Sequence, residues 1–333
     1  MNNHMYTTVL LLFISFILSA LLSYALVPFV KNLAKKANLF GVDVHKSWRP
    51  LIPKIGGIAI FVGVTVSILI TSFLFNMVDN RVLAFIISTE LAAIVGLWED
   101  FRELNPVLKP VLLALVGLPI VFMGAYYPYP NLPFVGKRTL TILYPILVPI
   151  AFTIVTNAIN SMDVLNGSMT FTSLVAASNI FLITLIKGNV LPAYLCASLL
   201  GSLAVFAYYN KYPAKLFPGN IGSLYVGASL ISIAIIGSVE IALLVTILPQ
   251  ITNEFHIIYS MRGFRSAKNL SERPVFVEND MLTANPSKKA PLTLVRMLTS
   301  KCSLSESEAV KMLVIISIFS AILALITEFF FIK

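Results

Sequence analysis

A pair of adjacent carboxylates and a lysine bracket one short polar loop of this chain. Glu99 and Asp100 stand in the segment GLWEDFRELNPVLKP, Gly96–Pro110, and Lys109 follows where the next apolar run begins. Adjacent side chains on a helix do not face the same way, so one carboxylate can point to a metal and the other to a substrate. Lys109 can reach back across the loop and hold a phosphate. An ordinary charged loop boundary would look similar.

Three amides and one acid fill a second junction, from which Lys and Arg are absent. The segment TNAINSMDVLNG, Thr156–Gly167, carries Asn157, Asn160, Asp163 and Asn166. Helix capping by Asn and Asp accounts for one or two of these positions. Oxygen-rich side chains of this kind suit a hard cation such as Mg²⁺, and amides also suit recognition of a planar base or a sugar.

A third loop, bracketed by prolines and glycines, places an amide directly before an apolar run. This loop, NKYPAKLFPGNIGS, spans Asn210–Ser223, and Lys211 and Lys215 give it positive charge. Asn220 lies at its end, where an oxygen ligand for a cation would be well placed. The alternative is a plain turn with Asn220 as the helix cap.

Two further loops are basic and could bind anions. The first, VDVHKSWRPLIPKIGGIAIF, contains Lys46 and a Gly-Gly pair whose backbone N–H groups can approach an anion. In the second, the long loop Thr252–Val310, a cationic stretch could clamp a pyrophosphate. Its members are Arg262, Arg265, Lys268 and Arg273. For a charge run of this kind, a solvated face beside anionic lipid is the alternative.

Composition places all of these loops between membrane-spanning helices. Hydrophobic residues make up 58% of the 333, only 12% are charged, and the mean hydropathy is +0.89. A soluble domain has about a quarter of its residues charged. A helix needs about 20 apolar residues to cross a bilayer, because lipid cannot satisfy free backbone groups. Ten runs are candidates, at roughly 6–27, 55–75, 82–98, 109–124, 140–157, 168–186, 190–209, 221–236, 239–252 and 311–331, of which 239–252 is short and the weakest.

The formal charge of +9 is explained by topology and needs no nucleic acid. Nineteen of the 24 Lys and Arg residues fall on the side of the odd-numbered loops, and five fall on the other. The positive-inside rule then predicts cytosolic loops at about 28–54, 99–108, 158–167, 210–220 and 253–310, with both termini extracytoplasmic. We therefore expect a single all-α polytopic domain over residues 1–333. The longest loop should contain an extended piece, Pro274–Glu278, and an amphipathic helix near Leu292–Leu298.

Together and in this order, the motifs resemble those of the polyprenyl-phosphate N-acetylhexosamine-1-phosphate transferases, of the glycosyltransferase family 4 type. The resemblance covers nearly the whole chain. GLWEDFRELNPVLKP matches the family's acidic pair and lysine, TNAINSMDVLNG its Asn-rich motif, and NKYPAKLFPGNIGS a loop that normally ends in Phe-x-Gly-Asp. The TNAIN and YPAKLFPG segments are most similar to archaeal and eukaryotic members, which use dolichyl phosphate.

The resemblance implies transfer of GlcNAc-1-phosphate from UDP-GlcNAc to dolichyl or another polyprenyl phosphate, with release of UMP. This is the first step of lipid-linked glycan assembly for N-glycosylation. It implies Mg²⁺ as the cofactor, with Mn²⁺ as an alternative, because two anions must be brought together. It also implies a multi-pass enzyme among the lipids of the cell membrane, or of the endoplasmic reticulum in a eukaryote, with a cytosolic active site. A homodimer is one assembly to consider.

The family's functional residues map onto positions of this chain. Asp100 would orient or deprotonate the acceptor phosphate beside Glu99, and Lys109 would contact a phosphate. Asn160 would ligate the metal, with Asn220 at the position of a second ligand. The substrate-binding positions would be Asn157, Asp163, Asn166, Lys46, Arg262 and Arg265.

The chain departs from the family pattern at two positions. Glu99 replaces the first Asp of the acidic pair, and Asn220 replaces an Asp, which removes a charge from the expected metal site. The family's Pro-Arg-His-Arg signature is also absent. Three alternatives remain: a transferase acting on undecaprenyl phosphate for wall or surface polymers, an anion transporter, and an inactive membrane scaffold.

Overall fold

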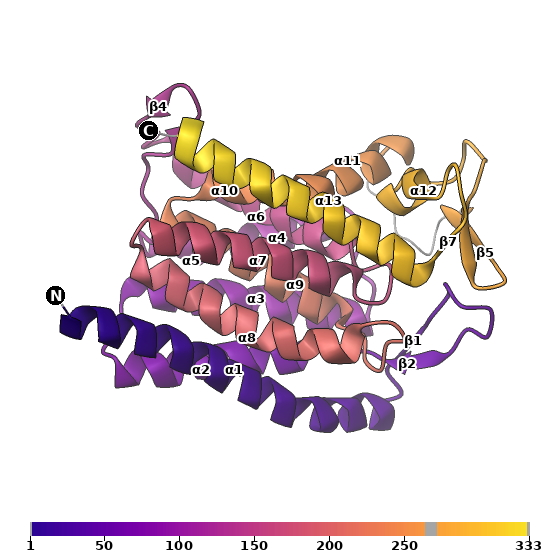
Figure 1. The fold of residues 1–333 in the computed structure, drawn as a ribbon, viewed down its shortest axis with the longest axis horizontal. Coiled ribbons are helices and arrows are strands. Elements are labelled where there is room, and N and C mark those ends of the chain that lie inside the picture. The colour runs from indigo at the N-terminus through magenta and orange to yellow at the C-terminus, as the bar shows by residue number, and fades with distance from the viewer. Residues whose placement is uncertain (1, 264–271, 332–333) are drawn as a thin grey trace.

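The computed structural model describes residues 2–263 and 272–331 as a bundle of long helices lying side by side (Figure 1). The helices are α1 (Asn2–Lys36), α2 (Gly57–Leu74), α3 (Asn80–Phe101), α4 (Leu108–Val116), α5 (Leu118–Phe122), α6 (Leu143–Ser161), α7 (Ser168–Ile186), α8 (Val190–Asn210), α9 (Gly219–Gly237), α10 (Glu240–Thr246), α11 (Leu248–Ser260), α12 (Leu294–Leu298) and α13 (Glu306–Ile326), which continues as the π-helical turn η2 (Thr327–Phe331). This confirms an all-α polytopic membrane architecture.

Short antiparallel strands lie at the ends of the bundle. They are β1 (Phe40–Val42) paired with β2 (Leu51–Pro53), β3 (Asn131–Leu132) paired with β4 (Gly136–Lys137), and the three-stranded order β5 (Val275–Glu278), β6 (Met281–Ala284), β7 (Leu304–Ser305). β5 confirms the extended piece expected at Pro274–Glu278. α12 falls within the segment where a short helix was expected.

Within the described ranges, eight helices are long and apolar enough to cross a membrane. A ninth span exists if α10 and α11, which are bent by 66° at their junction, count as one. The expected run at 109–124 is divided between α4 and α5, and together these two helices are shorter than a full span. Each break comes just before a proline, Pro119 or Pro249. Proline lacks the N–H that would continue the helical hydrogen bonds, which explains both interruptions.

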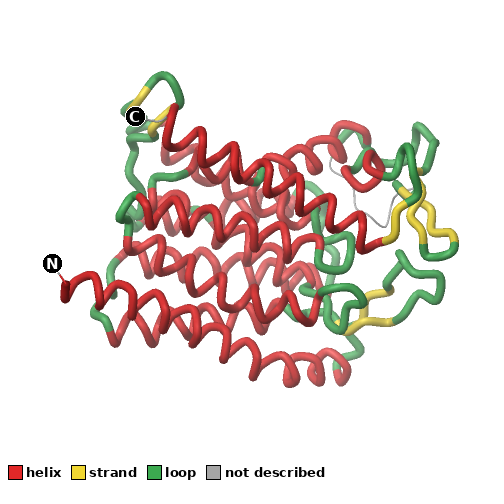
Figure 2. The backbone as a smooth tube through the Cα atoms, in the orientation of Figure 1, coloured by secondary structure: helices red, strands yellow, loops and turns green. Residues whose placement is uncertain are grey.

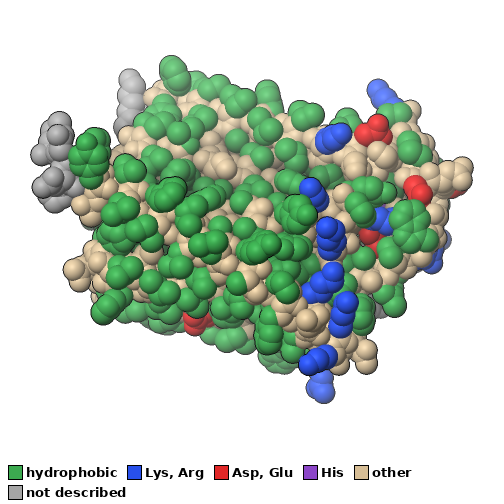
Figure 3. Space-filling view, turned by 60° about the horizontal axis from the view of Figure 1, so that its bottom comes forward, with side chains coloured by type: hydrophobic (Ala, Val, Ile, Leu, Met, Phe, Trp, Pro, Cys, Tyr) green, Lys and Arg blue, Asp and Glu red, His purple; other side chains and the backbone are tan. Residues whose placement is uncertain are grey.

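The bundle has two distinct ends (Figure 2). The start of α1 and the end of η2 lie at one end, where the Phe134 N–H donates to the Phe331 carbonyl at 3.1 Å. β1, β2 and β5–β7 lie at the other, which we call the cavity end. Lys and Arg side chains form a band across the surface near one end, beside a broad hydrophobic surface (Figure 3). The prediction that the first polar loop begins near residue 28 is wrong, because α1 continues through Pro28 to Lys36.

The central helix of the bundle is α9. Every residue of α9 is buried except Asn220, which lies in its first turn. Two glycines allow neighbouring helices to approach this turn. A Cβ on Gly57 of α2 would lie 2.2 Å from the Gly222 Cα atom, and a Cβ on Gly96 of α3 would lie 2.5 Å from the Asn220 carbonyl oxygen. The tight packing fixes the ends of α2, α3 and α9 against one another at the cavity end.

Candidate active site

A cavity of about 1300 Å³ lies at the cavity end, enclosed by polar loops and the ends of α3, α4, α6, α9 and α11. It gathers most of the residues predicted from the sequence: Lys46, Glu99, Asp100, Lys109, Asn157, Asn160, Asp163 and Asn220 all line it. Asn166 and Arg262 are not among its lining residues. Arg265 lies outside the described residues.

Asp100 is held at the N-terminus of α9. Its two carboxylate oxygens accept hydrogen bonds from the backbone N–H groups of Asn220 and Ile221, both at 3.0 Å. The Lys54 ammonium lies 3.5 Å from Oδ1, and the Asp100 side chain is only 1% exposed. A carboxylate at the positive end of a helix is stabilised by the free N–H groups there. Asp100 therefore fixes the start of α9, and with it Asn220, relative to α3.

Gly219 is required for this arrangement. Its φ of +70° lies in the left-handed region, which side chains other than glycine rarely adopt. A Cβ atom at this position would lie 2.6 Å from Oδ2 of Asp100. The glycine thus lets the backbone of α9 approach the carboxylate closely.

A second chain of contacts joins α3, α4, α6 and α9. The Lys109 ammonium lies 2.8 Å from Oε2 of Glu99 and donates to Oδ1 of Asn160 at 3.0 Å. The Asn160 amide nitrogen in turn donates to Oδ1 of Asn220 at 2.8 Å and to the Ser223 hydroxyl at 2.7 Å. The residues that the sequence placed at successive helix ends are therefore directly connected in space.

Asp163 also faces the cavity, but unlike Asp100 it does not hold the start of a helix. It lies in the loop between α6 and α7 and keeps partial exposure at the cavity wall. Burial, together with the nearby Asp100 charge, raises the pKa of Asp163 to about 7, while Lys54 opposes the shift. Its charge therefore changes near neutral pH.

Lys46 and Asn166 belong to a buried cluster beside the cavity. The Lys46 ammonium pairs with Asp43 and lies 2.9 Å from Oε2 of Glu306, the first residue of α13. Asn166 donates from its backbone and side-chain nitrogens to Glu306 Oε1, each at 2.6 Å, and accepts from the Ala214 N–H at 2.6 Å. The cluster connects three of the loops predicted to be cytosolic to the start of α13. The contacts of Asn166 therefore stabilise the fold.

The first basic loop and the β5–β6 hairpin meet at the cavity border. The Ser47 backbone N–H and hydroxyl both donate to Oδ1 of Asp280, at 3.0 and 2.8 Å. These hydrogen bonds lower the pKa of Asp280. Burial lowers the pKa of the neighbouring His45 to about 4; Lys46 and Arg273 add to the decrease, and Asp43 opposes it. His45 is therefore neutral at physiological pH.

Arg273 of the predicted cationic stretch lines the cavity, and Lys54 and Arg49 of the first basic loop add positive charge. Asn253 and Glu254 of α11, which bring an amide and an acid, were not selected from the sequence. The two α11 residues come directly after the apolar run expected at 239–252. Their position at the end of that run is the feature of the sequence that could have indicated them as site residues. Among the arginines of the long loop that the structure describes, Arg273 lines the cavity and Arg262 does not.

The oxygen donors at the centre of the cavity are suited to a hard cation. The two amide oxygens, Oδ1 of Asn160 and Oδ1 of Asn220, belong to side chains that are hydrogen-bonded to each other. Glu99 and Asp100 supply negative charge next to them. Across residues 2–263 and 272–331, no three His, Cys, Asp or Glu side chains gather as a metal site. A cation here would depend on amide oxygens, which ligate Mg²⁺ without neutralising it.

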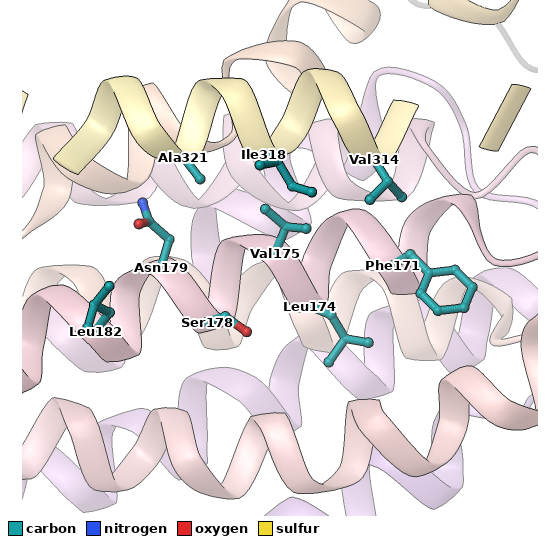
Figure 4. Close-up of a pocket in the computed structure, with 9 residues that line it drawn as sticks. All are labelled: Phe171, Leu174, Val175, Ser178, Asn179, Leu182, Val314, Ile318 and Ala321. Atoms are coloured by element: carbon teal, nitrogen blue, oxygen red, sulfur yellow. The ribbon is translucent and has the colours of Figure 1, made fainter. Parts of the chain in front are cut away.

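A shallower groove of about 420 Å³ lies elsewhere, between α7 and α13 (Figure 4). Its lining runs from Phe171 to Leu182 on α7 and from Val314 to Ala321 on α13, and it is almost entirely apolar. Asn179 is engaged there with the Thr246 hydroxyl at 2.7 Å. The groove shares no lining residue with the cavity.

Comparison with known proteins identifies the family. Residues 82–238 match the model of glycosyl transferase family 4. A Saccharolobus solfataricus protein, provisionally named UDP-N-acetylglucosamine–dolichyl-phosphate N-acetylglucosaminephosphotransferase, is 32% identical over 73% of this chain and 76% of its own length. A Bacillus subtilis protein, provisionally named undecaprenyl-phosphate N-acetylglucosaminyl 1-phosphate transferase, is 29% identical over 67% of this chain and 62% of its own. The phospho-N-acetylmuramoyl-pentapeptide-transferase of Bacillus licheniformis is 24% identical over 69% and 75%. The chain belongs to glycosyl transferase family 4.

Proposed function

We propose that this protein transfers GlcNAc-1-phosphate from UDP-GlcNAc to a polyprenyl phosphate of the dolichyl type and releases UMP. One observation carries the proposal. Asp100, Lys109, Asn160 and Asn220, from four different helices or their ends, are joined by direct contacts at one cavity of a membrane bundle. The provisional name of the Saccharolobus solfataricus relative supports the choice of donor and acceptor.

The cavity offers both substrates a place. Part of its lining is apolar and includes Pro106, Pro110, Ile257 and Ile258. A lipid phosphate can bring its head group along this apolar part while its chain stays in the membrane. Lys54 and Arg273 give the lining basic groups that suit the diphosphate of a nucleotide sugar.

The reaction exchanges one phosphoanhydride bond for another. An oxygen of the acceptor phosphate attacks the phosphorus that carries the sugar, and the bond from that phosphorus to the UMP oxygen breaks. Both reactants are anions, so positioning and charge neutralisation are the main requirements. Lys109 donates to the Asn160 amide oxygen and is placed to hold a phosphate, and Asp163 lines the cavity near Asp100 and Lys54. Asp100 acts as a positioning residue, because its oxygens are occupied by α9 and Lys54.

Mg²⁺ is the cofactor we propose, with Asn160 and Asn220 as the ligands. Bound there, a divalent cation would offset charge on the phosphates as they approach. Asn220 replaces the expected carboxylate, so we expect modest metal affinity. The location we propose is the cell membrane, with the cavity end in the cytosol, where nucleotide sugars are available.

The test is a transfer assay with purified protein, UDP-GlcNAc, dolichyl phosphate and Mg²⁺. UMP release well above that of an Asp100→Asn variant is expected. Equal, negligible release by both would refute the transferase and favour an inactive scaffold. Nucleotide-sugar uptake into proteoliposomes without UMP release would instead favour a transporter.

The second candidate is transfer to undecaprenyl phosphate, which the provisional name of the Bacillus subtilis relative favours. The same reaction chemistry applies, and only the length and saturation of the lipid differ. A comparison of dolichyl and undecaprenyl phosphates at equal concentration separates the two. A higher kcat/KM with undecaprenyl phosphate would overturn the dolichyl assignment and leave the transferase intact.

A further inference from the structure

The Lys109 ammonium lies in a pocket made of oxygen atoms. It is 2.8 Å from Oε2 and 3.1 Å from Oε1 of Glu99, and 3.0 Å from Oδ1 of Asn160. Carboxylate and amide oxygens are also the ligands that a hard divalent cation takes. The side chains of Lys109 and Glu99 are only 15% and 14% exposed, so the ion pair is well enclosed.

The amide oxygens around this ion pair already accept hydrogen bonds. Oδ1 of Asn160 accepts from Lys109, and Oδ1 of Asn220 accepts from the Asn160 amide nitrogen. Each amide oxygen has a second lone pair, but a cation bound to Oδ1 of Asn160 would stand beside the Lys109 ammonium, and the two positive charges repel. Binding of a cation to both amide oxygens therefore favours release of the ammonium from Asn160.

We propose that Lys109 occupies the cation site as an internal substitute, and that divalent cation binding and release of Lys109 are one coupled event. This rests on the proposed function, because it concerns the same metal site. The ammonium neutralises Glu99 and holds Asn160 in place before the metal arrives. Once displaced, its ammonium is available to a phosphate in the cavity.

The coupling imposes an order of events. Lys109 donates to Oε1 of Glu99 and Oδ1 of Asn160, which leaves at most one N–H for a phosphate, so full capture of a phosphate by Lys109 follows cation entry. The side chain of Glu99 is long enough to bring both carboxylate oxygens within 3.1 Å of the Lys109 ammonium, and it thereby helps to hold the lysine in the cation site. Lys109 is thus both a competitor of the metal and a phosphate ligand that becomes fully available in its presence.

The direct test measures Mn²⁺ binding to the full-length protein in detergent, without nucleotide, from the electron paramagnetic resonance signal of the free ion. Lys109→Met should bind Mn²⁺ more tightly than the wild type, by about fivefold or more, because the resident ammonium no longer competes. Transfer activity of the same variant should nevertheless be lost. Asn160→Leu should abolish the tight site.

Lys54→Met is the matched control. Lys54 lines the same cavity and pairs with a carboxylate, Asp100, but at 3.5 Å and with 31% of its side chain exposed. Its removal changes the net charge by the same amount without emptying the oxygen pocket. We expect a change of less than about twofold, because exposed pairs are weak. Equal tightening in both variants would overturn the proposal and reduce it to a general charge effect.

A second measurement uses the wild type and needs no variant. Reductive methylation of Lys109, quantified by mass spectrometry, should rise when Mn²⁺ is added, since the amine leaves its partners. Methylation that stays constant or falls on Mn²⁺ saturation would overturn the proposal, as would unchanged or weaker Mn²⁺ binding by Lys109→Met. If neither the wild type nor Lys109→Met binds Mn²⁺, the metal site of the proposed function fails, and the inference fails with it.

Discussion

Replacing Gly219 by alanine should strongly reduce the transferase activity while leaving the helical bundle folded. Residue 219 has a φ of +70°, and a left-handed conformation costs a residue with a side chain about 1 kcal/mol. The new Cβ atom would stand 2.6 Å from Oδ2 of Asp100. The carboxylate must therefore move by several tenths of an ångström, away from the N–H groups of Asn220 and Ile221. Loss of one charge-assisted hydrogen bond adds about 2 kcal/mol, for a total near 3 kcal/mol.

Gly188 supplies a matched control for the backbone strain. It shares the φ of +70°, but a Cβ atom there would meet nothing within 4 Å. Gly188→Ala should therefore cost only about 1 kcal/mol and keep full activity, as the strain is the same and no catalytic group is touched. The difference between the two variants isolates the contact with Asp100.

The assay combines UMP release at saturating substrates with thermal unfolding in detergent. We expect Gly219→Ala to lose at least about tenfold in kcat, because shifting Asp100 also shifts Asn220 and Lys54. Its Tm should lie below that of Gly188→Ala. Wild-type activity in Gly219→Ala would show that the placement of Asp100 is irrelevant to transfer and would refute the positioning role assigned to it.

The other predictions concern stability, pH and metal. Glu306→Gln should lower the Tm markedly in thermal unfolding, because breaking a buried ion pair costs about 3 kcal/mol or more and leaves Lys46 with an incomplete set of partners; an unchanged Tm would count against the buried cluster. His45 has a pKa of about 4 in the fold and an ordinary value of 6.5, so the unfolded chain takes up its proton first as pH falls. Stability present above pH 6.5 should thus decline towards pH 4, and His45→Asn should flatten this decline in Tm. Asn220→Asp should tighten Mn²⁺ binding by adding a charged ligand; weaker binding would place the metal elsewhere. Chelation with EDTA should abolish UMP release and added Mg²⁺ should restore it; undiminished release in EDTA would remove the metal from the proposal.

Most of the helices follow from apolar runs, because a lipid-facing or buried helix needs no periodic polar face. The exceptions lie at prolines. Pro119 and Pro249 mark breaks, whereas Pro28 and Pro149 lie inside α1 and α6. Whether a proline interrupts a helix depends on how neighbouring helices satisfy the freed backbone groups, which a run of apolar residues does not encode.

The centre of the candidate site was predictable for a simple geometric reason. Glu99, Lys109, Asn160 and Asn220 all stand at helix ends on one side of the membrane, so a compact bundle brings them together. The role of Asn166 was not predictable in this way. Its main partner, Glu306, is 140 residues away in the sequence, at the start of a helix that carries no recognised motif. Charged partners at that separation reveal themselves only once the helices are packed.

The basic band in Figure 3 has a consequence for how the acceptor is found. Each Lys or Arg near an anionic membrane surface attracts acidic head groups by about 1 kcal/mol. A polyprenyl phosphate is itself an acidic head group carried by the bilayer. The band should therefore enrich the acceptor in the ring of lipid around the protein, so that its capture becomes a short two-dimensional search, faster in dilute salt than in concentrated salt.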